Sequence, residues 1–144
     1  MVAPLSRERN LVARVTRDFD APRPQVWSGI LDIGWYMPVA DTSAEWRPGG
    51  AIRWKAELLG RIPVEVHGAV DELDPGRAVS WHWRDPLLHV VHHVAMELSE
   101  TGTGTRLVLE EDGHATEKEL AHAEGGWRLM LSNLKFQLEN RQSG

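Results

Sequence analysis

Apolar and polar residues alternate along much of the chain, and this alternation predicts a series of β-strands. The clearest case is Ala51–Leu58, in which Ile52, Trp54 and Ala56 alternate with charged residues. The same pattern predicts strands, bounded by turns with Gly, Pro or Asp, at Leu11–Phe19, Ser43–Trp46, Val64–Leu73, Ala78–Trp83, His89–Leu98 and Thr105–Glu111. Since the strands after Ser43 follow one another through short turns, we expect an antiparallel meander.

Helical spacing predicts two short helices and one long one. Gln25–Leu31 carries apolar residues three and four positions apart, and a second helical turn at Asp32–Met37 ends before Pro38. The long helix begins near Thr116 and Glu119, which have the spacing of a capping box. Its apolar residues form one stripe at about 100° per residue and are Leu120, Ala123, Trp127, Met130, Leu131, Leu134 and Leu138.

Two adjacent glycines, Gly125 and Gly126, interrupt this stripe. Each glycine costs a helix interior about 1 kcal/mol relative to alanine. We therefore expect either a weak helix before Trp127 or a close approach of another backbone segment at the glycines.

The order of the elements predicts an α+β fold in which about six or seven antiparallel strands curve around the long C-terminal helix. An amphipathic helix has to bury its apolar stripe, and a curved sheet is the available partner. A sheet that bends around a helix leaves space between the two layers, and we expect a ligand there. A length of 144 residues is typical of one domain, so we expect a single domain over residues 1–144.

Tryptophan is the unusual feature of the composition, with seven Trp against two Phe and one Tyr. Large aromatic side chains fill protein cores and also line ligand pockets, and composition does not separate these two uses. The positions that we expect to line the ligand space are Trp35, Trp54, Trp81, Trp83, Trp127, Met130 and Leu134.

Charge and cysteine content exclude several classes of function. The chain has no cysteine, which excludes disulfides, thiolate catalysis and cysteine-based metal sites. A formal net charge of −5 without a block of Lys or Arg argues against binding to nucleic acid or to an anionic membrane. The N-terminal residues lack the apolar core of a signal peptide, so we expect a cytoplasmic protein.

Arg17 and Glu111 are two polar candidates for the ligand space. Arg17 shares the strand parity of the apolar residues Ala13, Val15 and Phe19. In that position it either holds a ligand carboxylate or phosphate, pairs with an internal acid such as Glu111, or extends to the rim of the sheet. If Glu111 points inward, it becomes available for acid–base chemistry.

The histidines include one further candidate, His92. Strand alternation places His92 on the opposite face from His89 and His93, so His92 faces the interior, either as a polar group of the cavity or as a hydrogen-bonded core residue. His82 and its neighbours on the next strand meet on the outer face, where we expect a surface cluster. Since no metal motif and no nucleophile–base spacing is present, we expect no metal, no cofactor and no catalytic residues.

Five motifs occur in an order that resembles a known family: RDFDAPRPQVW (17–27), RPGGAIRW (47–54), ELDPGRAVSWHW (72–83), GTRLVLEEDG (104–113) and EGGWRLMLSNL (124–134). Together they are similar to bacterial homologues of the C-terminal domain of Aha1, the activator of the Hsp90 ATPase, within the START/Bet v 1-like (SRPBCC) superfamily. The resemblance implies the helix-grip fold. Glu111 stands where family members often carry a histidine.

The resemblance leaves three functional hypotheses open. The first is binding of a small hydrophobic or amphipathic ligand between the sheet and the helix, without chemistry. The second is an enzyme similar to polyketide cyclases or dehydratases that uses Arg17, His92 or Glu111. The third is a co-chaperone-like regulator of the stress response that binds a protein partner. Leu129 and Phe136 lie opposite the core stripe and are candidates for a homodimer interface.

Overall fold

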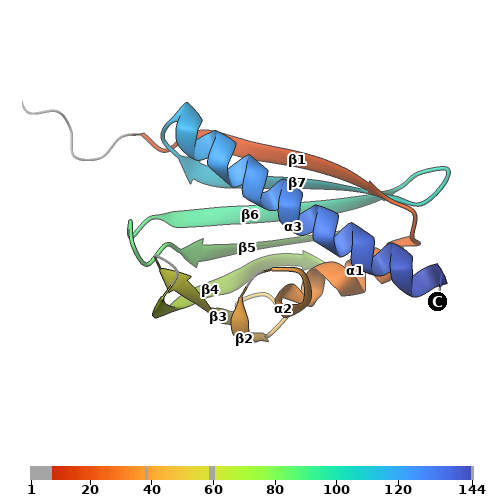
Figure 1. Ribbon diagram of the computed structural model, residues 1–144, viewed down its shortest axis with the longest axis horizontal. Coiled ribbons are helices and arrows are strands. Elements are labelled where there is room, and N and C mark those ends of the chain that lie inside the picture. Colours follow the sequence, from red (N-terminus) through yellow and green to blue (C-terminus); the bar gives the residue numbers. More distant parts are fainter. Residues whose placement is uncertain (1–7, 38, 59–60, 144) are drawn as a thin grey trace, which may run out of the picture.

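A seven-stranded antiparallel sheet curves around a long C-terminal helix in the computed structural model, which describes residues 8–37, 39–58 and 61–143 (Figure 1). The elements along the chain are β1 (Leu11–Phe19), α1 (Arg23–Leu31), α2 (Ile33–Tyr36), β2 (Ala40–Ala44), β3 (Ala51–Leu58), β4 (Ile62–Asp74), β5 (Ala78–Arg84), β6 (Val91–Glu100), β7 (Thr105–His114) and α3 (Glu117–Ser143). The strands lie in the order β1-β7-β6-β5-β4-β3-β2. This arrangement confirms the helix-grip α+β fold predicted from the sequence.

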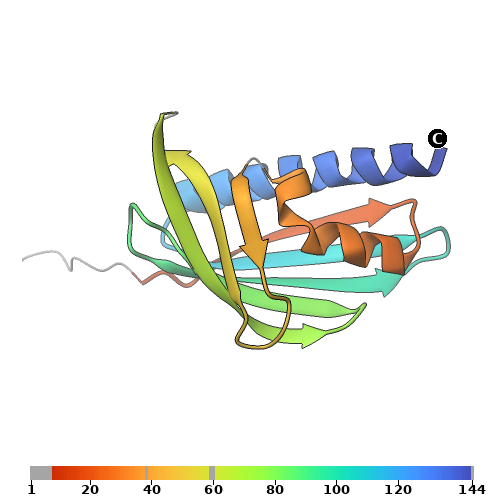
Figure 2. The same ribbon diagram turned by 90° about the horizontal axis from the view of Figure 1, so that it is seen from below.

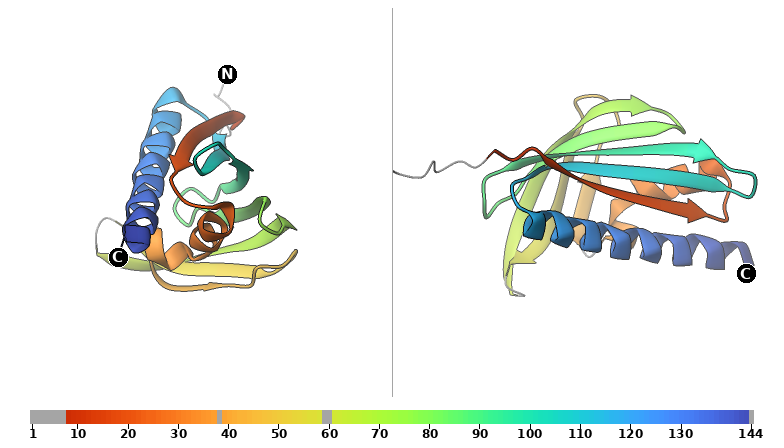
Figure 3. Two further views of the ribbon diagram at one scale, coloured as in Figure 1. Left: turned by 90° about the vertical axis from the view of Figure 1, so that its right-hand side faces the viewer. Right: turned by 90° about the horizontal axis from the view of Figure 1, so that it is seen from above.

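The helices lie on one side of the sheet. Helix α3 runs along the concave face, and α1 and α2 lie next to it (Figures 2 and 3). Leu134 and Leu138 of α3 pack so closely on α1 that a side chain at Gly29 would begin 3.0 Å from the Leu134 Cδ1 atom. The short helices therefore close the space beneath the C-terminal half of α3.

Burial follows the alternation that predicted the strands. Along β6, exposed and buried residues alternate, with Val94, Met96 and Leu98 facing the interior. The apolar stripe of α3 covers these inward-facing residues, and its buried members are Trp127, Leu131, Leu134 and Leu138. Fully burying a side chain of this size contributes about 1.5–3 kcal/mol.

The connection between α1 and α2 is tied together by Tyr36, which is buried. Its hydroxyl donates a hydrogen bond of 2.8 Å to the carbonyl oxygen of Ile30. Burial, together with the nearby negative charge of Asp32, raises the pKa of the Tyr36 hydroxyl well above its usual range, so the group stays protonated as a donor.

Several element boundaries differ from the sequence prediction. Strand β2 ends at Ala44, because Trp46 leaves the strand to donate a hydrogen bond from its indole Nε1 to the carbonyl oxygen of Leu31. Strand β6 begins at Val91, since His89 has a φ of 56° and lies in the preceding turn. Strand β7 continues beyond Glu111 to His114. Pro38 lies outside the described residues.

Helix α3 is continuous through the two glycines. At its start the backbone N–H of Glu119 donates to the Thr116 hydroxyl at 3.1 Å, which is the expected cap. A Cβ atom at Gly125 or Gly126 would meet no atom within 4 Å, so no other backbone segment approaches the helix there. Of the two alternatives for the glycines, the close backbone contact is therefore the wrong one. In the part of the chain that the structure describes, no helix is long and apolar enough to cross a membrane.

We predict that Gly125→Ala stabilises the protein. Gly125 is exposed within a continuous helix and has open space at the Cβ position, so alanine adds helix propensity without a clash. The free energy of unfolding, measured by urea denaturation, should rise by about 1 kcal/mol. An unchanged or lower value would show that the helix does not pass through this residue in solution.

Candidate functional site

A cavity of about 490 Å³ lies between the sheet and the N-terminal half of α3. This volume is within the range of small-molecule binding sites. The described residues that line it are Met37, Val39, Trp54, Ala56, Val64, Val66, Trp81, Trp83, Asp85, Pro86, Glu111, His122, Ala123, Gly126, Trp127 and Met130. Most of these side chains are apolar, and four of them are indoles.

Strand register explains how the sheet side of the cavity forms. Trp54 lies directly opposite Val66 in the pairing of β3 with β4. Trp81 and Trp83 are two residues apart on β5 and therefore share the inward face. The rings of Trp54 and Trp83 are 6.0 Å apart between centroids. The indoles from β3 and β5, on either side of β4, thus form a wall of the cavity.

The structure brings six of the candidate residues together at this cavity: Trp54, Trp81, Trp83, Glu111, Trp127 and Met130. His92 lies beside Trp83, and the two rings stack with their centroids 4.7 Å apart. It is buried, as strand alternation predicts, but it does not line the cavity.

Two candidates lie elsewhere along the helices. Leu134 is fully buried against α1 in the closed part of the core. Trp35 lines a separate depression beside α1, together with Gly29 and Leu138. Neither residue lines the cavity, because Leu134 packs on α1 and Trp35 of α2 borders the other depression.

Arg17 does not line the cavity, and of the three alternatives for it the structure matches extension of its side chain to the rim of the sheet rather than contact with a ligand or with Glu111. Its guanidinium Nη2 donates a hydrogen bond of 2.9 Å to the hydroxyl of Ser132, in a groove that also contains Lys135. In the strand register Arg17 lies opposite Leu107, whereas Glu111 lies opposite Ala13. Because β1 is an edge strand flanked by α3, a long side chain of inward parity extends past the helix to solvent.

Glu111 provides the buried carboxylate of the cavity and is only 4% exposed. Its Oε2 accepts a hydrogen bond from the indole Nε1 of Trp83 at 3.2 Å. Its Oε1 lies 3.2 Å from Nε2 of His114, which is 5% exposed. A buried carboxylate is costly unless it is hydrogen-bonded, and these two partners compensate part of that cost.

His114 is the residue of this site that the sequence analysis missed. In a regular strand, Glu111 and His114 would point to opposite faces. A β-bulge shifts the register between Leu11 and Ala13 on the paired strand, and Gly113 adopts a φ of +90°. The bulge places His114 on the same inner face as Glu111. A glycine within the extended strand pattern was the available signal.

Among the residues that the structure describes, two clusters have the geometry of incomplete metal sites. In the buried one, ligand atoms of His92, Glu111 and His114 lie within 4.8 Å of one another. His92 Nδ1 donates to the carbonyl oxygen of Asp112 at 2.8 Å, a contact that orients metal-binding histidines in many proteins. In this structure Trp83 and His114 each engage one Glu111 oxygen, and the cluster forms a polar network that orients the Glu111 carboxylate.

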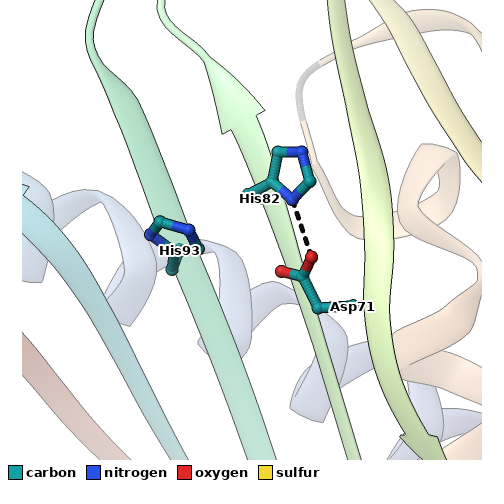
Figure 4. Close-up of side chains that lie close together, drawn as sticks. All are labelled: Asp71, His82 and His93. Atoms are coloured by element: carbon teal, nitrogen blue, oxygen red, sulfur yellow. Dashed lines mark hydrogen bonds and ion pairs between the residues drawn. The ribbon is translucent and has the colours of Figure 1, made fainter. Parts of the chain in front are cut away.

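The second cluster consists of Asp71, His82 and His93 on the outer face of the sheet (Figure 4). His82 Nδ1 lies 2.8 Å from Oδ1 of Asp71, and the two histidine rings are 5.8 Å apart between centroids. His93 Nδ1 instead contacts Asp112 at 3.1 Å. The members are exposed or half-buried and lie on the opposite side of the sheet from the cavity, as strand alternation predicts.

Leu129 and Phe136 are 73% and 67% exposed on α3. Their position agrees with the face expected from helical periodicity, and a homodimer formed through them remains a prediction.

The fold and the lined space define the class of the protein as a helix-grip domain with a cavity beneath the C-terminal helix. The family model for activator of Hsp90 ATPase homolog 1-like proteins matches residues 20–139, and the chain belongs to this family. A comparison with curated proteins finds no match.

Solved structures share the same architecture. A protein from Cytophaga hutchinsonii is 29% identical with a TM-score of 0.81, over 95% of this chain and 99% of that one. A protein from Nitrosomonas europaea is 20% identical with a TM-score of 0.74, over 93% and 97% of the two chains. DynU16, a protein in the dynemicin biosynthetic locus, is 18% identical with a TM-score of 0.74, over 89% of this chain and 47% of that one.

We predict that Gly113→Ala strongly destabilises the protein. Alanine disfavours a φ of +90°, and its Cβ would lie 2.6 Å from Nδ1 of His92. The free energy of unfolding should fall by more than about 2 kcal/mol.

Gly76→Ala is the matched control for this prediction. Gly76 has a φ of +81° in a surface turn, and a Cβ atom there would meet no atom within 4 Å. Its substitution should cost only the backbone strain, about 1 kcal/mol. Equal losses in the two variants would contradict the close contact between Gly113 and His92.

Proposed function

We propose that the protein binds a small hydrophobic or amphipathic molecule in the cavity between the sheet and α3. The observation that carries this proposal is the lining itself, in which four indoles and one buried carboxylate border the same space. Cavities with apolar and aromatic walls and a few placed polar groups are typical of small-molecule sites. Membership of a superfamily that includes lipid carriers and hormone receptors supports the same role.

Helix α3 forms one edge of the cavity, and the residues at this edge have small side chains. Ala123 and Gly126 line the cavity with little or no side chain, next to Asp85 and Pro86 of the β5–β6 loop. We infer that a ligand enters between this loop and the helix. Such an entrance explains why position 126 carries a glycine, although glycine weakens a helix.

An enzymatic role is the second candidate, and the Glu111–His114 pair is the observation that favours it. A carboxylate and an imidazole at 3.2 Å can hold and move a proton next to a bound molecule. Catalysis needs a set of placed polar groups, whereas binding of an apolar molecule does not. Among the described residues that line the cavity, the ionisable ones are Asp85, Glu111 and His122, so binding remains the first candidate.

We predict that Gly126→Leu weakens ligand binding. The new side chain would extend from the helix into the cavity, because Gly126 lines it and has open space at the Cβ position. With the neutral apolar fluorophore N-phenyl-1-naphthylamine as the probe, the dissociation constant should rise by at least about tenfold. The measurement is a fluorescence titration of the folded protein.

Gly125→Leu is the matched control. It changes the adjacent residue in the same way, but at a position about 100° away around the helix that does not line the cavity. The probe should bind to this variant as it does to the wild type. Equal weakening in both variants, or no binding of the probe to the wild type, would contradict the proposed function.

A further inference from the structure

Carboxylates outnumber basic groups among the polar residues of the cavity. Among the described residues that line it, the carboxylates Asp85 and Glu111 are accompanied by one imidazole, that of His122, and by no Lys or Arg. Arg17, the cation that the sequence suggested for this place, bonds to Ser132 on the other side of α3. A bound carboxylate or phosphate would therefore meet like charges and no guanidinium or ammonium group.

The Glu111 carboxylate has room for a further partner. Each carboxylate oxygen has two lone pairs, and Trp83 and His114 each engage one oxygen. A carboxylate accepts hydrogen bonds and attracts positive charge, but it donates nothing when ionised. The ligand group next to Glu111 is therefore a donor or a cation.

The aromatic walls favour the cation. The faces of indole rings attract positive charge when a cation lies within about 6 Å of the ring centroid. Trp54 and Trp83, whose centroids are 6.0 Å apart, both line the cavity with Trp81 and Trp127. His92 covers one face of Trp83. The indole Nε1 of Trp83 donates a hydrogen bond that anchors this ring to Glu111. Aromatic faces and a carboxylate thus border the same space.

We propose that the cavity selects an organic cation, namely a protonated amine or a quaternary ammonium group carried on an apolar body. The cationic group lies near Glu111 against the aromatic side chains of the lining, and the apolar body lies along the aliphatic and methionine side chains. This inference rests on the proposed function because it names the class of ligand for the same cavity.

Three compounds with the same alkyl chain test the charge preference: octyltrimethylammonium, 1-octanol and octanoate, each below its micelle concentration. Each is used to displace N-phenyl-1-naphthylamine from the wild-type protein at neutral pH and constant ionic strength. The cation should displace the probe at a concentration about tenfold lower than 1-octanol does, and octanoate should be the weakest competitor.

Glu111→Gln and Glu110→Gln then locate the source of the preference. Both substitutions remove one negative charge from β7, but Glu110 is exposed on the outer face, where it pairs with Arg14. Glu111→Gln should abolish most of the preference for octyltrimethylammonium over 1-octanol, and Glu110→Gln should preserve it. Circular dichroism checks the fold of both variants.

The outcomes separate the inference from the proposed function. If 1-octanol and the probe bind but the cation has no advantage, the selection of a cation is wrong while the binding function stands. If Glu110→Gln reduces the preference for the cation as much as Glu111→Gln does, the preference comes from the overall charge of the protein, and the inference is also wrong. If the probe does not bind to the wild type, both ideas fail. Should Glu111→Gln not fold, the wild-type ranking of the three compounds still decides.

Discussion

The packing of the apolar stripe of α3 against the concave sheet is the interaction on which the rest of the structure depends. Helix α1 closes the space under the C-terminal half of α3, where Leu134 and Leu138 of α3 contact α1 at Gly29. The N-terminal half of α3 lies over the cavity, where Trp127 and Met130 line the open space. The same amphipathic helix therefore supplies core burial at one end and a binding wall at the other, and the cavity exists because the short helices reach only part of the concave face.

Within that cavity, the buried charge of Glu111 constrains its surroundings. The carboxylate needs donors, and the sheet provides Trp83 from β5 and His114 from the end of β7. His114 reaches it only through the bulge at Gly113, and Gly113 in turn lets the ring of His92 lie close behind the wall. One polar network thus links three neighbouring strands and sets the orientation of an indole that lines the cavity.

The solved structures with this architecture show that very different sequences adopt the fold. The proteins from Nitrosomonas europaea and the dynemicin locus align at TM-scores of 0.74 with identities of 20% and 18%. A backbone shared at such identities allows different side chains on the inner faces of the strands. The function of this chain is therefore decided by the particular residues on those faces, in which tryptophan and carboxylate predominate over basic groups.

The sequence alone determined the order of the strands and helices and the face to which side chains of the regular segments point, because periodicities of two and 3.6 residues are local properties. Trp54, Trp81, Trp83 and Trp127 line the cavity and His92 is buried, as those periodicities indicate. Only the tertiary structure decided what covers each face. It placed Arg17 beside Ser132, packed Leu134 on α1, and turned His114 inward through the Gly113 bulge. These outcomes depend on contacts between segments far apart in the chain, and a local pattern carries no information about which segments meet.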